Sequence, residues 1–265
     1  MSPQASSNPV KLRGHGFQPR VVPWMSWAFV AGVLAVWGGG SRLGWIDELM
    51  LPSPQRVGAS LVELVASGEI WGHLAASLQR IAAGWALGFA AGLALGVLVG
   101  VSSLSRSVGL PLVAALFPIP KIALLPLFIL WFGIGEASKV ATIAFGVFFP
   151  TVVSTYAAVD SVPRSLIRMG QSFELGPRAI VAKILLPGAL PGVLAGARIS
   201  VSIALILVVA AEMIGAQKGV GALILTAGHL LQTDRLIAGV VILSLLGLVL
   251  GAALDRLERR LLRWR

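Results

Sequence analysis

Long apolar runs, separated by shorter segments that hold most of the charged residues, dominate the chain. Uncharged or nearly uncharged runs cover residues 21–41, 81–101, 107–135, 140–159, 193–211 and 236–254. A helix needs roughly 20 mostly apolar residues to cross the hydrocarbon core of a bilayer. The pattern therefore predicts an all-α, polytopic membrane protein with about six transmembrane helices.

The composition supports the prediction of a membrane protein and excludes several kinds of functional site. Of the 265 residues, 57% are hydrophobic and 12% are charged, and the mean hydropathy is +0.89. A soluble domain carries about 25% charged residues, so this chain has too little polar surface to cover a globule. The absence of cysteine excludes disulfides, thiolate metal sites and thiol nucleophiles, and three scattered histidines leave little for a zinc site.

The net charge of +10 indicates an orientation in the membrane. In a soluble protein, 21 basic against 11 acidic residues would suggest nucleic acid. In a membrane protein, basic residues gather on the cytoplasmic side. With a cytoplasmic N-terminus, 13 of the 21 basic residues lie inside, five outside and three within or beside the runs. The sequence therefore predicts cytoplasmic termini and no nucleic-acid partner.

The runs divide the chain into three parts. A basic leader covers residues 1–20, a membrane domain covers 21–260, and a short cytoplasmic tail covers 261–265. No small-residue cleavage site precedes Arg42, so the first run is predicted to be an uncleaved anchor rather than a signal peptide.

The outside linker between the first two runs, residues 42–76, is too charged to span. Its Ser-Pro opening and the spacing of Val57, Leu61, Leu64 and Val65 predict an amphipathic helix on the outer surface.

Glycine recurs every four residues in the second run, which places five residues without side chains on one helix face. Another helix can approach closely there, and such contacts are a main source of cohesion between helices in lipid. Helix packing is therefore preferred over a substrate groove for this face, which comprises Gly84, Gly88, Gly92, Gly96 and Gly100.

The third run contains prolines that break a straight helix. Pro118, Pro120 and Pro126 each lack a backbone donor, so carbonyl groups are freed near mid-membrane. Lys121 lies in this stretch and needs a partner, water or an anionic ligand. Lys121 and the nearby Trp131 are candidates for a translocation pathway; the alternative is that the lysine snorkels or pairs structurally.

Two further charges lie in or beside the fifth run. Glu212, near its outer end, is the third candidate pathway residue, as a partner of Lys121 or as a residue that flanks a gate. Arg198, near the inner end, is expected to snorkel.

The only long inside segment, residues 160–191, carries its own helix signals. A Ser-Val-Pro start precedes apolar residues at helical spacing, which predicts a short helix with one apolar face. Gly176 and Pro177 end it, and residues 179–186 can form a second short helix before Pro187. Two short helices at a turn form a knob that fits a partner's groove.

Several enzymatic motifs are missing. The chain contains no GxxxxGK[ST] phosphate loop, no HExxH and no GxSxG elbow, so it is predicted not to be an enzyme. Active transport would then need energy from a partner. An ion-coupled carrier is a rival, but Glu212 is its only candidate acid. A membrane enzyme is a second rival, and the missing hydrolytic and metal motifs weigh against it.

The segment 160–191 resembles the cytoplasmic loop of the membrane subunits of binding-protein-dependent ABC importers. That loop carries Glu-Ala-Ala, then a glycine, then Ile-x-Leu-Pro. With Ile184 and Pro187 in the last part, the glycine place falls on Glu174 and the Glu-Ala-Ala place on residues 168–170, while Gly176 offers a turn glycine two residues later. The resemblance assigns coupling to an ATPase to Leu166, Arg168, Met169, Gly170, Phe173, Glu174, Gly176 and Pro187.

Other segments narrow the resemblance to permeases for nitrate, sulfonate and taurine. They are "FPIPKIALLPLFILWFGIGEASK" (117–139), "LPSPQRV" (51–57), "LPGALPGVLAGARIS" (186–200) and "AEMIGAQKGVGALI" (211–224), and the likeness runs from about residue 24 to 260. Some members of the group handle thiamine precursors, bicarbonate or aromatic carboxylates.

This resemblance implies an ABC importer permease fold, in which residues 160–191 form the coupling loop. It further implies a homodimer in a bacterial inner membrane, two ATPase subunits that bind ATP and Mg, and a periplasmic or lipid-anchored substrate-binding protein. No cofactor is expected in the chain itself.

Overall fold

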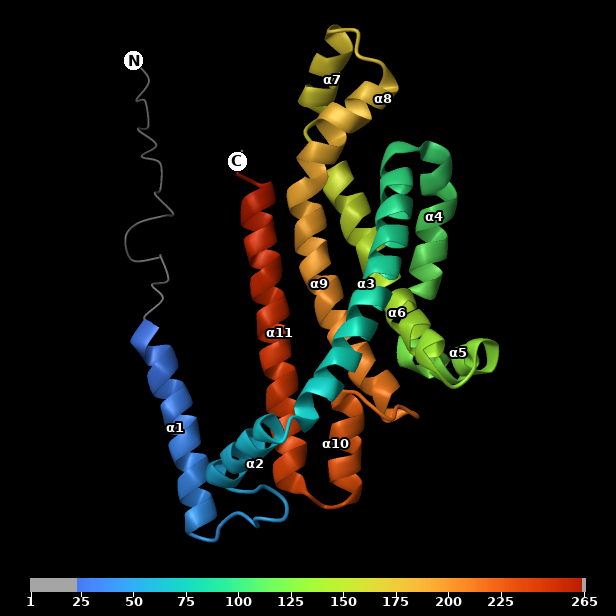
Figure 1. The fold of residues 1–265 in the computed structure, drawn as a ribbon. Coiled ribbons are helices and arrows are strands. Elements are labelled where there is room, and N and C mark those ends of the chain that lie inside the picture. The colour runs from blue at the N-terminus through green and yellow to red at the C-terminus, as the bar shows by residue number, and fades with distance from the viewer. Residues whose placement is uncertain (1–22, 264–265) are drawn as a thin grey trace, which may run out of the picture. The chain divides into compact units, whose positions relative to one another are not determined.

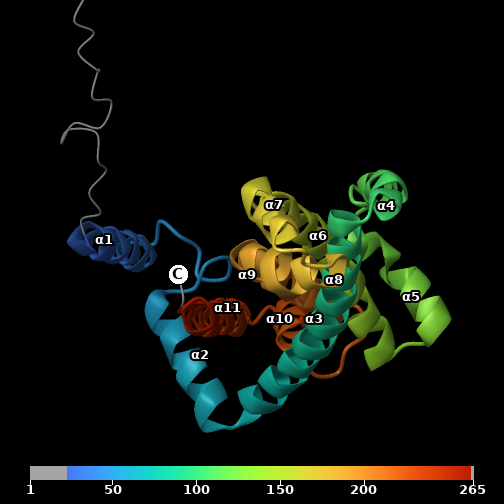
Figure 2. The same ribbon diagram turned by 90° about the horizontal axis from the view of Figure 1, so that it is seen from above.

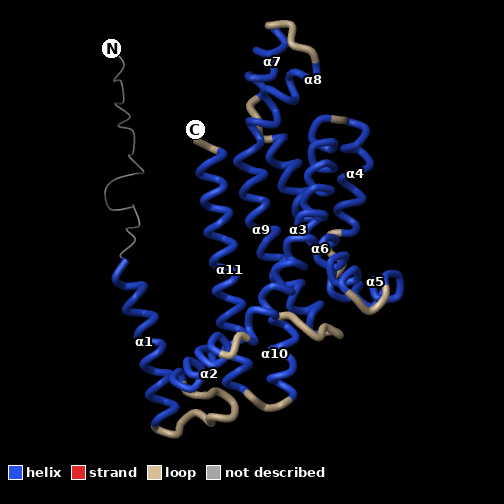
Figure 3. The backbone as a smooth tube through the Cα atoms, in the orientation of Figure 1, coloured by secondary structure: helices blue, strands red, loops and turns tan. Residues whose placement is uncertain are grey.

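The computed structural model describes residues 23–263, and the described residues are helical or in loops, without a strand (Figure 3). The chain divides into two compact units, residues 1–55 and 56–265. Helix α2 (Pro54–Ala66) begins at the end of the first unit and continues into the second.

The first unit is built on helix α1 (Pro23–Arg42), which forms within the first predicted run. Residues 21 and 22 of that run lie outside the described residues, as does the predicted leader. Helix α1, with 20 residues, is long enough to cross a membrane but is not among the candidate spans. Its tryptophans and a run of three glycines lower its mean hydropathy.

The linker after the first run contains the predicted amphipathic helix. Helix α2 buries Val57, Ser60 and Leu64, while Val65 is exposed. The linker also ends sooner than predicted, because α3 starts at Glu69 rather than at residue 81.

The second unit is a bundle of long helices with shorter elements at its ends (Figure 1). After α2 come α3 (Glu69–Val101), α4 (Ser103–Leu116), α5 (Leu125–Phe132), α6 (Glu136–Asp160), α7 (Arg164–Ser172), α8 (Pro177–Ile180), α9 (Leu186–Met213), α10 (Val220–His229) and α11 (Thr233–Leu261). Four described helices are long and apolar enough to cross a membrane, namely α3, α6, the continuous α8–α9 stretch and α11.

The third predicted run is broken, as its prolines require. Helices α4 and α5 meet at an angle of 88° across a break that contains Pro118 and Pro120, and Pro126 stands in the first turn of α5. Counting this bent pair as one span gives five candidates in the described chain, against the predicted six. The all-α polytopic fold class is confirmed.

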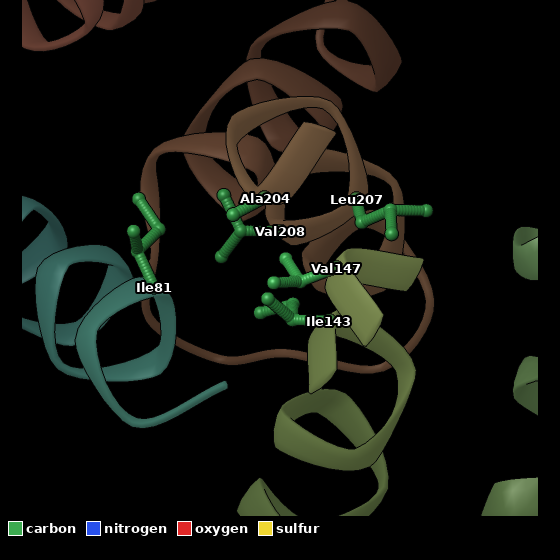
Figure 4. Packing of buried hydrophobic residues seen from close by; sticks show 6 residues of the cluster. All are labelled: Ile81, Ile143, Val147, Ala204, Leu207 and Val208. Atoms are coloured by element: carbon green, nitrogen blue, oxygen red, sulfur yellow. The ribbon is translucent and has the colours of Figure 1, made fainter. Parts of the chain in front are cut away.

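Helix α6 forms the centre of the bundle, between α3 and α9 (Figure 2). Its Ile143 and Val147 pack with Ile81 of α3 and with a group on α9 (Figure 4). The α9 members of this cluster are Ala204, Leu207 and Val208.

The glycine face of α3 lies directly against α6. A Cβ atom at Gly92 would lie 2.7 Å from the Phe148 carbonyl oxygen, and one at Gly96 would lie 2.6 Å from Thr155 Cβ. The other three glycines of the face also meet α6, at Ile143, Ala144 and Val159. Side chains at Gly88, Gly92 and Gly96 would meet the backbone of α6 itself and would therefore force the two helices apart.

The two ends of the second unit are built from different elements. Helices α7 and α8 form one end, and α10 with the loop before it forms the other (Figure 1). Helices α6 and α9 both run from one end to the other, and the 25 residues of α6 alone extend for about 37 Å. Changes at either end can therefore be transmitted by the same two helices.

Candidate functional site

Residues 161–187, which we call the knob, project as a helical hairpin from the ends of α6 and α9 (Figure 1). Pro163 precedes α7, where its fixed φ suits a helix start. The first predicted short helix is thus present as α7.

The apolar side chains proposed for a partner are exposed on the knob. Leu166 is 40% exposed, Met169 is 51% exposed and Phe173 is 75% exposed. Gly170 instead faces the knob's interior, where an added Cβ would lie 2.7 Å from Ile184 Cδ1. The knob therefore presents large apolar side chains outward and packs small or aliphatic ones within itself.

The turn of the knob is made by Glu174. Its φ of 58° lies in the left-handed region that favours glycine, and the Leu175 amide donates to the Gly170 carbonyl at 3.1 Å. This is the position where the resembling family carries glycine. Gly176 has φ −66° and ψ 160°, so the prediction that it serves as the turn glycine is wrong.

The second short helix does not end at Pro187. Helix α8 passes through a π-helical segment, Val181–Leu185, straight into α9, and the Leu186 amide donates to the Val181 carbonyl. In a π-helical turn each amide bonds to the carbonyl five residues earlier, so the hydrogen-bond register shifts just before Pro187. Pro187 has no amide hydrogen and therefore fits within the first turn of α9. The knob is consequently continuous with a candidate span.

Arg106 ties the base of the knob to the α3–α4 connection. Its guanidinium contacts Asp160 at 2.9 Å, donates to the carbonyls of Val99 and Gly100, and lies 5.0 Å from the centre of the Tyr156 ring. A cavity of 420 Å³ lies beside this contact, between the ends of α3 and α6 and the knob.

Lys121 folds back on its own broken segment. Its ammonium donates to the carbonyls of Phe117, Leu116 at 3.3 Å and Ile119 at 2.8 Å. It also lies 5.2 Å from the centre of the Phe117 ring and 4.9 Å from that of Phe149. This side chain thus satisfies carbonyls at the break, among them that of Leu116, which Pro120 leaves without its helical amide donor. The arrangement fits the structural alternative for Lys121.

The three candidate pathway residues do not share one site. Trp131 is 61% exposed on α5 and packs edge-on against Phe128, with 5.9 Å between ring centres. Glu212, near the end of α9, is fully buried and pairs with Arg80 of α3. The predicted pairing of Glu212 with Lys121 is therefore wrong.

Glu212 belongs to a buried polar network that joins several elements. Its carboxylate accepts hydrogen bonds from Arg80 Nη1 at 2.8 Å, Ser77 Oγ at 2.8 Å and the Gly221 amide at 2.9 Å. Arg80 also donates two hydrogen bonds to the Glu136 carboxylate, at 2.5 and 2.6 Å. This Arg80 network connects α3, α6, α9 and α10 at the α10 end.

The loop between α9 and α10 completes the network. Arg80 donates to the Lys218 carbonyl at 2.6 Å, and the Val220 amide donates to Ser77 Oγ at 2.9 Å. Gly219 has φ 140°, and a Cβ atom there would collide with the Glu212 carboxylate. Both the conformation and the close approach require glycine at this position.

Arg198 is paired as well as exposed. Its guanidinium contacts Asp255 and Glu258 of α11, the latter at 2.8 Å, and its side chain remains about half exposed. The position is compatible with the expected snorkelling.

Sequence reasoning missed Arg80 as the partner of Glu212. The signal was an arginine beside an apolar run, since such a charge needs a carboxylate partner. The chain has 11 acidic residues, and 132 residues separate Arg80 from Glu212, so the choice of partner depended on how the helix ends assemble.

Comparison with known proteins gives a consistent result. The family described as "Binding-protein-dependent transport system inner membrane component" matches residues 88–263. The chain is 38% identical to the putative aliphatic sulfonates transport permease protein SsuC of Escherichia coli, over 92% of each chain. It is 36% identical to the taurine transport system permease protein TauC of the same organism, over 89% of this chain and 87% of TauC.

A solved structure shares the fold. A chain in the inward-facing MetNI methionine ABC transporter superimposes with a TM-score of 0.61 at 27% identity, covering 70% of this chain and 93% of that one. Together with the apolar helices, these matches identify a multi-pass membrane protein of the permease type.

Proposed function

Because the chain belongs to the family of inner membrane components of binding-protein-dependent transport systems, we propose that it is the permease of an importer for small sulfonates such as taurine. The main support for this proposal is the similarity to SsuC and TauC over about nine-tenths of the chain. Permeases of this family are not the ATP-hydrolysing component, in agreement with the prediction that the chain is not an enzyme.

The proposal includes the assembly in which the permease works. Two copies form a homodimer in the bacterial inner membrane, with both termini and the knob in the cytoplasm. Two ATPase subunits, which carry ATP and Mg, grip the knob, and a substrate-binding protein delivers the solute to the α10 end. The exposed apolar face of α7 supports this placement of the ATPase.

In the proposed mechanism the knob acts as a lever. Closure of the ATPase pair moves the knob, and α6 and α9 carry the movement toward the α10 end because both run the whole way. The rival mechanism, coupling to an ion through Glu212, is disfavoured because Arg80 already compensates that carboxylate.

The test is reconstitution of the permease with its ATPase and binding protein in proteoliposomes. We expect ATP-dependent, saturable uptake of labelled taurine and ethanesulfonate. Uptake of another solute with no uptake of either sulfonate would overturn the proposed substrate class, and sulfonate uptake driven by an ion gradient without ATP would overturn the importer.

A further inference from the structure

A polar cavity of 540 Å³ lies at the α10 end, beside the Arg80 network. Three elements line it: α3 near Gln79 and Arg80, the start of α6, and the loop that holds Gln217 and Lys218. Cavities enclosed by long apolar helices are usually lined by apolar side chains, so this concentration of polar groups calls for a chemical explanation.

Lys139 is the unusual group in the cavity wall. The residue is 4% exposed, and its ammonium donates one hydrogen bond, to the Gly135 carbonyl at 2.9 Å. No carboxylate of the described residues forms a direct ion pair with this ammonium, although the charges of Glu136 and Glu212 act on it from a greater distance. Buried charges in proteins are normally paired, because removing an ammonium from water is costly. A buried ammonium with donors to spare therefore points to a partner outside this chain.

The charges of the residues that line the cavity indicate that this partner is negatively charged. The lining residues include three with positive charges, Arg80, Lys139 and the exposed Lys218, against one with a carboxylate, Glu136. Both oxygens of Glu136 are already engaged by Arg80. Glu212 lies fully buried on the other side of Arg80 and leaves the total positive.

Two neutral features add to the positive potential. The start of α6 borders the cavity, and its N-cap residue is Gly135, which has no side chain to cap the helix. The partial positive charge of a helix N-terminus favours an anion. The amides of Gln79 and Gln217 provide further hydrogen-bond donors.

We propose that this cavity is a receiving site for the anionic head group of a small solute, with Lys139 as the group that pairs with it. The inference rests on the proposed function for the identity of the solute, a sulfonate, but the site is defined by charge. It replaces Lys121, whose ammonium is occupied by backbone carbonyls, as the cation that meets an incoming anion.

The absence of cysteine from the chain allows a direct test. A single cysteine is introduced at the cavity by Gln217→Cys, and its reaction rates with an anionic and a cationic methanethiosulfonate reagent are measured on the full complex in nanodiscs. The anionic reagent carries an ethylsulfonate group and so serves as the ligand's analogue. Ser67→Cys, exposed in the loop before α3 and outside the cavity lining, is the matched reference site.

We expect the anionic-to-cationic rate ratio at residue 217 to exceed that at residue 67 by about tenfold. Adding Lys139→Met should remove most of this preference, whereas Lys139→Arg should retain it. Arg259→Met, which removes an exposed charge from α11, should not change it. Ethanesulfonate at millimolar concentration should protect the cysteine from both reagents.

The outcomes separate this inference from the proposed function. Equal rate ratios at the two cysteines, or a ratio unaffected by Lys139→Met in an assembled complex, would overturn the receiving site even if the complex imports sulfonates. Anion preference and protection at residue 217, in a complex that imports no sulfonate, would support the site and overturn the proposed substrate.

Discussion

Arg80 is the residue on which the α10 end depends most. It is 4% exposed and neutralises a fully buried Glu212 while holding Glu136 at the start of α6. Removing one partner of a buried pair leaves an uncompensated charge, which is more damaging than removing both.

We therefore expect Arg80→Met to destabilise the protein by about 3–5 kcal/mol, and Arg80→Met/Glu212→Met to be less harmful than Arg80→Met alone. Arg198 is the matched control, because it also contacts two acids but is half exposed. Arg198→Met should cost at most about 1 kcal/mol. The apparent Tm of the purified protein measures all three. A shift for Arg198→Met as large as that for Arg80→Met would contradict this account.

Glu174 carries backbone strain in the turn of the knob. A non-glycine residue in the left-handed region costs about 1–2 kcal/mol, and glycine removes that cost at some loss of entropy in the unfolded state. Glu174→Gly should therefore raise the apparent Tm, or protect the knob from limited proteolysis, by an amount equivalent to about 0.5–1 kcal/mol.

Gly176→Ala is the control variant for this prediction. The φ of residue 176, −66°, suits alanine, and a Cβ atom there would meet no neighbour. It should not weaken the knob. If Glu174→Gly proves destabilising while Gly176→Ala is neutral, the turn is not strained as described.

At the scale of elements, the close packing of α3 on α6 holds the bundle together. The glycine face brings the two backbones into contact, and dispersion forces across such a contact replace the hydrophobic drive that lipid does not supply. A bulky side chain has to displace the main chain of α6 rather than a flexible side chain.

Gly92→Leu should accordingly prevent assembly of a stable complex. Gly72→Leu, in the same helix, is the control, since a Cβ atom at residue 72 has no neighbour within 4 Å. Size-exclusion chromatography of the two variants compares them directly. Purification of Gly92→Leu as a stable, monodisperse complex would show that the α3–α6 contact is not required.

Apolar runs and prolines predicted most of the elements, because hydropathy and the loss of a backbone donor act locally. The break after α4 and the helix α7 follow from residues close in sequence. The early start of α3 and the continuity of α8 with α9 were not predictable in this way. The early part of α3 carries Arg80, whose charge is compensated by carboxylates distant in sequence. The continuity of α8 with α9 involves a π-helical segment just before Pro187.

For the whole molecule, the central feature is that α6 and α9 join the knob to the Arg80 network and the cationic cavity. The sequence indicated a knob and a membrane permease, but placed the pathway on Lys121, Trp131 and Glu212. The structure separates these three residues because each is held by local or long-range contacts that a single sequence does not reveal.

The most direct test of coupling through the knob is substrate-stimulated ATP hydrolysis by the reconstituted complex, with ATPase retention measured on the same samples. Phe173, 75% exposed, would be a buried anchor in the complex, so Phe173→Ala should cost about 2 kcal/mol or more and weaken ATPase binding about thirtyfold. Arg168→Ala should cost at most about 1 kcal/mol, as exposed ion pairs do. Unchanged stimulation and ATPase retention in Phe173→Ala, or a larger loss in Arg168→Ala, would contradict coupling through the apolar face of the knob.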